Sequence, residues 1–77
     1  MDDLKSILSA RVKKRSVAIS GHLTSISLEE PFWRELQNLA DLEKTSLSAL
    51  IAKIDRDRGT NLSSALRLYV LASYHKV

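Results

Sequence analysis

The sequence predicts a mostly α-helical fold with a short β-ribbon, and two observations support this prediction. Between His22 and Ala40 the hydrophobic period changes from two residues to about 3.6, which is typical of a strand that runs directly into an amphipathic helix. Two further segments with helical spacing follow, each behind its own capping residue. Because a lone strand cannot satisfy its own backbone hydrogen bonds, the predicted strand also needs a partner.

The composition limits the chain to one small domain. Its 77 residues include no cysteine and two histidines, which excludes disulfides and makes a closed zinc site of sulfur and imidazole ligands implausible. We therefore expect no metal and no cofactor. A chain of this length buries only roughly 60% of the surface that its unfolded form exposes, so we expect it to gain burial by forming a homo-oligomer.

The distribution of apolar residues predicts no membrane segment. No apolar run approaches the ~20 residues of a membrane span. Asp2 and Asp3 open the chain in place of the basic flank of a signal peptide. We expect a soluble, cytoplasmic protein.

The positive charge is concentrated at the amino terminus. Residues 1–22 carry five basic and two acidic residues, so their net charge equals the +3 of the whole chain. We interpret residues 1–15 as a basic arm and residues 16–77 as the folded domain. The arm is expected to be partly helical, because one face of a short helix would hold Leu4, Ile7, Leu8 and Val12. Such an arm suits a polyanion, although a solvated tail explains the charge equally well.

A second strand is predicted just before the first turn signal. Val17 and Ile19 are odd-numbered whereas Ile26 and Leu28 are even-numbered, so one uninterrupted strand would place the two apolar pairs on opposite faces. A two-residue turn at 21–22 would correct the phase and would pair Val17 with Ile26 and Ile19 with Thr24. A bulge at Gly21 would correct it as well.

Capping residues delimit three helices. Pro31 lacks an N–H group and therefore fits the first turn of a helix, which we expect to end near 43–45. Ser46 is a good cap for a second helix that continues to about Asp57. Thr60 or Asn61 would cap a carboxyl-terminal helix over residues 60–76.

The order of these elements resembles the ribbon-helix-helix family of Arc/MetJ-type DNA-binding proteins, and in particular its short bacterial members. The resemblance rests on TSISLEEPFW, on the helix through Ala40, on TSLSALIAKI and on NLSSALR. It implies an intertwined homodimer in which the strands of two copies pair antiparallel. The residues that it places in the shared dimer core are Ile26, Leu28, Phe32, Trp33, Leu36, Leu50 and Ile54.

The resemblance also implies a DNA-binding homodimer that acts as a small transcriptional regulator. The outer face of the ribbon, Leu23, Ser25 and Ser27, would face the major groove. Phosphates would be bound by the basic arm and by the amino terminus of the second helix, that is by Lys13, Lys14, Arg15, Lys44, Thr45 and Ser46.

The outer ribbon face departs from the family pattern. Ribbons that read DNA usually display arginine, lysine, asparagine or glutamine, whereas this face offers two hydroxyls and an alkyl group. The alternative function is therefore a protein-interaction module, an antitoxin-like subunit or adaptor, with the same dimer fold. We expect no enzyme, because the chain has neither a Gly-x-Ser-x-Gly motif nor a phosphate-binding loop.

Overall fold

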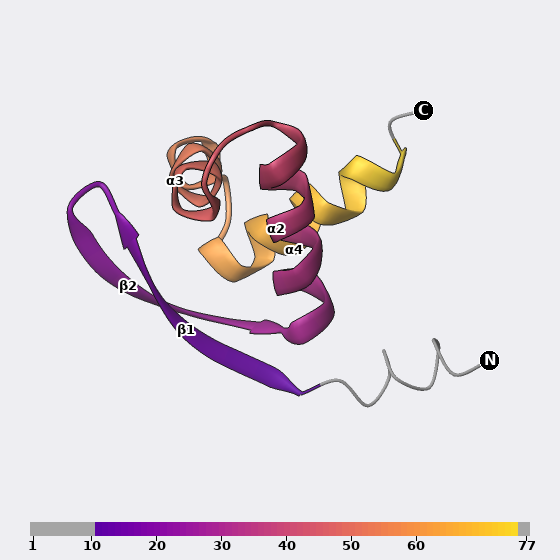
Figure 1. Ribbon diagram of the computed structural model, residues 1–77. Helices are drawn as coiled ribbons and strands as arrows, with labels where there is room; N and C mark the ends of the chain where they lie inside the picture. Colours follow the sequence, from indigo (N-terminus) through magenta and orange to yellow (C-terminus); the bar gives the residue numbers. More distant parts are fainter. Residues whose placement is uncertain (1–10, 76–77) are drawn as a thin grey trace.

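The computed structural model describes residues 11–75 and shows a two-stranded antiparallel ribbon followed by three helices (Figure 1). The elements are β1 (Val12–Ile19), β2 (His22–Glu29), α2 (Glu30–Leu42), α3 (Leu47–Asp57) and α4 (Leu62–His75). The predicted fold class is confirmed. The amino-terminal helix expected through Leu4, Ile7 and Leu8 lies outside the described residues, and Val12, which was assigned to the same helix, is instead the first residue of β1.

The ribbon is a hairpin within one chain. Its eight residue pairs run without interruption from Val12 with Glu29 to Ile19 with His22, so the phase is corrected by a turn and not by a bulge. The turn residues are Ser20 and Gly21, with φ of 49° and 85°. Positive φ at both central positions is the type I′ conformation, whose twist matches that of the flanking strands.

The predicted register of this hairpin was wrong by two residues. Val17 pairs with Thr24 and Ile19 with His22, where a turn at 21–22 would have paired them with Ile26 and Thr24. Both registers keep the same residues on the same faces, so the apolar pattern cannot separate them. The type I′ turn at 20–21 decides between them.

Strand β1 begins earlier than expected. It starts at Val12, so Lys13, Lys14 and Arg15 belong to the hairpin and not to an arm before it. The indole Nε1 of Trp33 donates a 3.0 Å hydrogen bond to the carbonyl oxygen of Lys13, which fixes the start of β1 against α2. Only residues before Val12 remain for the predicted arm.

The hydrophobic core lies between one face of the hairpin and the helices. Helix α3 packs against β1, and α2 and α4 pack against β2 (Figure 1). Side chains directly opposite each other share a face of the ribbon, so odd-numbered residues of β1 and even-numbered residues of β2 point to this core. The buried residues are Val17, Ile19, Ile26, Leu28, Trp33, Leu36, Ala40, Leu50, Ile51, Ile54, Ala65, Leu66 and Val70.

The caps of the helices lie close to the predicted positions, although α4 begins at Leu62 and not at residue 60. Pro31 occupies the first turn of α2, and Lys44 follows its end in the left-handed conformation with φ of 56°. The Ser46 Oγ accepts a 3.0 Å hydrogen bond from the Ala49 amide at the start of α3. Of the two caps considered for the last helix, Asn61 is the one used, since its Oδ1 accepts a 2.9 Å bond from the Ser64 amide.

Polar contacts connect α4 to the rest of the domain. The hydroxyl of Tyr69 donates a 2.6 Å hydrogen bond to Glu43, whose carboxylate also lies 3.5 Å from the Lys53 ammonium group. This hydrogen bond raises the pKa of Tyr69 to about 12. Near the start of α4 the Ser63 hydroxyl donates to the carbonyl oxygen of Ser27, at 3.1 Å. These contacts link α4 to β2 and to the end of α2, where Glu43 also binds Lys53 of α3.

Candidate nucleic-acid interface

The outer face of the hairpin is the surface that the sequence predicted would face a ligand. In β2 it carries Leu23, Ser25 and Ser27. Leu23 is 78% exposed, Ser25 is exposed and Ser27 is half-buried. All three lie on the side of the sheet away from the core, since the even-numbered residues of β2 point inward.

Strand β1 adds residues to this face that the sequence prediction missed. Lys14 pairs with Ser27, Ser16 with Ser25 and Ala18 with Leu23. All three β1 residues are exposed. The face therefore presents one ammonium group and several hydroxyls on two adjacent strands. The sequence did contain a signal for these residues, because Lys14, Ser16 and Ala18 alternate with the apolar Val17 and Ile19. The alternation is hard to recognise, since the inward positions before Val17 are occupied by the charged residues Lys13 and Arg15.

The two other basic residues of β1 lie on the opposite face. The Lys13 ammonium group is 3.3 Å from a carboxylate oxygen of Glu30, and the Arg15 guanidinium lies 5.2 Å from the centre of the Trp33 ring. Their charges are thus directed toward the start of α2. Of the three residues predicted to contact phosphate from the arm, Lys14 alone shares the outer face with the serines.

The second predicted phosphate site lies in the turn between α2 and α3. Lys44, Thr45 and Ser46 occupy this turn. Helix α2 separates the turn from the end of β2 (Figure 1), and its 13 residues make it about 20 Å long. Ser46 caps the Ala49 amide, which leaves the earliest amides of α3 without a partner inside the helix. The structure therefore keeps this turn separate from the outer hairpin face.

Helix α4 contacts the outer face of the hairpin at its base and so limits the exposed surface there. The Arg67 guanidinium lies 2.9 Å and 3.4 Å from the two carboxylate oxygens of Glu29, the last residue of β2. This hydrogen bond lowers the pKa of Glu29. The free part of the face therefore ends before Glu29.

The residues expected in a shared dimer core are packed within one chain. Leu28 and Leu36 are both 0% exposed, and Leu50 and Trp33 are 1% and 2% exposed, without any contribution from a second copy. Phe32 packs at the margin of the same core, and Ile26 and Ile54 are buried in it. Strand β1 contributes to this burial, because Val17 and Ile19 belong to the same core. Whether two copies share the core remains a prediction.

Two further findings concern the described part of the chain. Within residues 11–75, histidine and acidic side chains nowhere gather in a group of three that could hold a metal ion. None of the described helices is both long enough and apolar enough to cross a membrane.

Comparison with known proteins agrees with this architecture. A solved structure of an uncharacterized protein from Bordetella pertussis Tohama I superposes with a TM-score of 0.71 at 29% sequence identity. The similarity covers 86% of this chain and 58% of that one, so this chain spans little more than half of that neighbour. No curated protein matches the sequence.

The family comparison covers nearly the whole described region. A family described as "Ribbon-helix-helix domain" matches residues 12–74, from the first residue of β1 almost to the end of α4. The match includes both strands and all three helices. The chain therefore belongs to the ribbon-helix-helix domain family.

Proposed function

We propose that the protein is a non-catalytic, homodimeric regulator of transcription in the cytoplasm, and that it binds duplex DNA through the outer face of its hairpin. The main support for this proposal is that one chain supplies a complete two-stranded ribbon, with Lys14, Ser16 and Ser25 exposed on its outer face. A two-stranded ribbon is the largest β-structure that the major groove admits. Lys14 would neutralise a phosphate, and the hydroxyls would contact base edges or phosphates.

The width of the groove limits how two copies can be arranged. Strands in a sheet lie about 4.8 Å apart, so two hairpins joined edge to edge would be wider than the roughly 12 Å of the major groove. The proposed homodimer therefore keeps each hairpin as a separate ribbon. The turn that holds Lys44, Thr45 and Ser46 is proposed as a second phosphate contact, because free helical amides favour an anion there.

Fluorescence anisotropy tests the DNA-binding proposal. The wild-type protein is titrated against a duplex from its own upstream region and against a shuffled duplex, at low and at physiological salt. We expect tighter binding to the upstream duplex and a steep loss of affinity with salt. Equal binding to both duplexes would limit the function to non-specific phosphate contact, and no binding to either would refute it.

Two variants that each lack one lysine test whether the outer hairpin face is the DNA interface. Lys14→Ala should reduce the slope of log affinity against log salt by about 0.9 for each hairpin in contact with DNA, and so by about 1.8 for a homodimer that binds through both hairpins. Lys53→Ala is the matched control, because it removes the same charge from α3, where Lys53 lies beside Glu43. Equal slopes for both variants would place the interface elsewhere.

One observation favours a second function, that of a protein-interaction module such as an antitoxin-like subunit or an adaptor. The outer hairpin face exposes Leu23 to 78% and Val12 to 56%, and apolar side chains suit a protein partner better than a base edge. This alternative expects no DNA affinity. It also expects a purified partner complex that Leu23→Asp abolishes.

A further inference from the structure

A small polar cleft lies between β1 and α2, on the side of the hairpin that faces away from the proposed DNA interface. Its volume is about 220 Å³. Two guanidinium groups and one carboxylate line it, together with an indole ring and an amide, and the residues are Arg15, Glu30, Trp33, Arg34 and Gln37. The outer hairpin face uses none of these side chains, so the proposed DNA contact does not explain why they gather here.

The Arg15 guanidinium is held in place at this cleft with its donors available. Trp33 is 2% exposed, and its Nε1 donates a 3.0 Å hydrogen bond to the Lys13 carbonyl oxygen, so the indole ring is fixed. Arg15 stacks on this ring, with its guanidinium carbon 5.2 Å from the ring centre. A stacked guanidinium uses its flat face, which leaves the N–H groups at its edge free to donate. Within residues 11–75, Arg15 forms no ion pair.

The charges around the cleft favour an anion. The carboxylate of Glu30 lies 3.3 Å from the Lys13 ammonium group and 3.8 Å from the Arg34 guanidinium, so Lys13 makes the closer contact. Lys13, Arg34 and Arg15 together outnumber this single carboxylate by two charges. The Arg34 side chain is 71% exposed, and its long contact with Glu30 leaves it free to turn toward a ligand.

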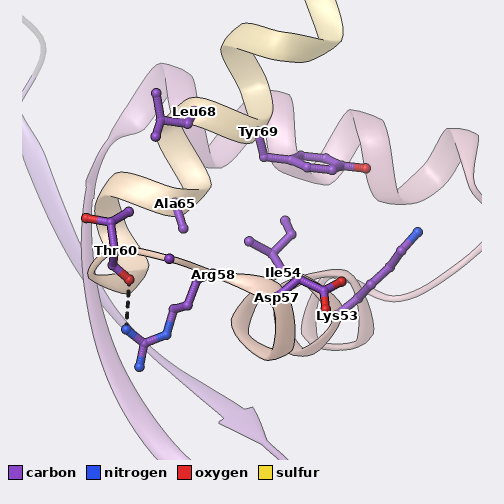
Figure 2. A pocket seen from close by; sticks show the side chains of 9 residues that line it. Lys53, Ile54, Asp57, Arg58, Thr60, Ala65, Leu68 and Tyr69 are labelled. Atoms are coloured by element: carbon purple, nitrogen blue, oxygen red, sulfur yellow. Dashed lines mark hydrogen bonds between the residues drawn. The ribbon is translucent and has the colours of Figure 1, made fainter.

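A larger hollow between α3 and α4 has the opposite character. Its volume is about 350 Å³, and Lys53, Asp57 and Arg58 are the charged residues of its lining (Figure 2). Both cations are already paired, Lys53 with Glu43 at 3.5 Å and Arg58 with Asp55 at 2.7 Å. The carboxylate of Asp57 adds a negative charge. The excess of positive charge is therefore a property of the cleft beside β1 and not of this hollow.

We propose that the cleft between β1 and α2 binds the phosphate group of a small phosphate monoester, with Arg15 and Arg34 as the donors. The paired N–H groups of a guanidinium match the oxygen atoms of a phosphate. The volume of about 220 Å³ is below the roughly 300–1,000 Å³ of sites for drug-sized ligands, so the cleft holds a phosphate group with few attached atoms. This inference goes beyond DNA binding and does not depend on it, because the cleft lies on the inner side of β1.

Intrinsic fluorescence tests the proposal, because Trp33 lines the cleft and is the one tryptophan of the chain. The protein is titrated with inorganic phosphate and with glycerol phosphate, and sodium chloride keeps the ionic strength constant. Both titrations should saturate, with dissociation constants of about 1 mM because the cationic side chains are exposed. Arg34→Gln should raise these constants at least about fivefold. Arg56→Gln is the matched control, since it removes an exposed guanidinium from α3, outside the cleft, and should change nothing. A response that does not saturate, or equal constants for Arg34→Gln and the wild type, overturns the proposal.

The salt dependence of DNA binding distinguishes a free phosphate ligand from the phosphates of a DNA backbone. Arg34→Gln should leave the slope of log affinity against log salt as in the wild type, whereas Lys14→Ala reduces it. A slope that Arg34→Gln also reduces would show that the cleft contacts the DNA backbone, and it would overturn the assignment to a small ligand. The fluorescence titration contains no DNA, so its result stands whether or not the outer hairpin face binds a duplex.

Discussion

The inner and outer faces of the β1–β2 hairpin alternate along the same two strands but have opposite surroundings. Ile26 and Leu28 point inward and are 2% and 0% exposed. Leu23 and Ser25 point outward, and both are exposed. Three helices cover the first face and leave most of the second open to solvent (Figure 1). The inner face therefore stabilises the fold, whereas the outer face is accessible to a ligand.

The largest effect should come from a fully buried residue of the inner face. Leu28→Ala removes three carbon atoms from a side chain that is completely buried and leaves a cavity between the hairpin and the helices. We expect the free energy of unfolding to fall by about 2–5 kcal/mol, as measured by urea denaturation.

The outer face supplies the control for this substitution. Ser25→Ala changes an exposed side chain on the same strand, so the free energy of unfolding should stay within about 0.5 kcal/mol of the wild type. A loss of similar size for Leu28→Ala and Ser25→Ala would show that both faces are covered in solution. Such a result would contradict the assignment of the outer face as a free surface.

A smaller effect is expected at the tip, where the turn sets the register of both faces. Gly21 has φ of 85°, and a Cβ atom there would meet no other atom within 4 Å. Any cost of Gly21→Ala therefore comes from the backbone, and we expect about 1 kcal/mol by urea denaturation. Gly59 has equally open surroundings without a positive φ, so Gly59→Ala should cost nothing or stabilise slightly. Equal effects at the two glycines would contradict the type I′ turn.

Local patterns in the sequence were sufficient to predict much of the fold. The opposite parity of Val17 and Ile26 required a turn or a bulge, and the hairpin is one of these two solutions. The first turn of α2 at Pro31 and the cap at Ser46 depend on chemistry within a few residues. Such local signals can be recognised without knowledge of the tertiary structure.

Features that depend on distant contacts could not be predicted in this way. Lys13 and Arg15 resemble a solvated arm in the sequence, and their place on the inner face depends on Glu30 and Trp33, which lie 15 or more positions later. Because these contacts cannot be read from the sequence, neither the start of β1 nor the position of Lys14 on the outer face could be predicted. The burial of Trp33 within one chain likewise follows from the hairpin that covers it.

The smallest effect concerns the base of the hairpin, where α4 ends the free outer face. Arg67 binds the Glu29 carboxylate, and this hydrogen bond keeps the pKa of Glu29 below its ordinary value of 4.5. A depressed pKa in the folded state gives a stabilisation that is present above the unfolded pKa and is lost as the pH falls through the folded pKa. Since both side chains are about one-third exposed, we expect less than about 1 kcal/mol at neutral pH.

Glu29→Gln tests this contribution through its pH dependence. The variant should melt at a lower temperature than the wild type at neutral pH, and the difference should shrink as the pH falls below 4.5 and through the lowered pKa of Glu29, because protonation removes the charge of the wild-type carboxylate. Arg67→Gln should show the same trend, and the double variant should lose little beyond either single one, since both remove the same contact. A difference in melting temperature that stays constant over this pH range would mean that the Glu29 carboxylate does not hold α4, and the free outer face would then extend to the base of the hairpin.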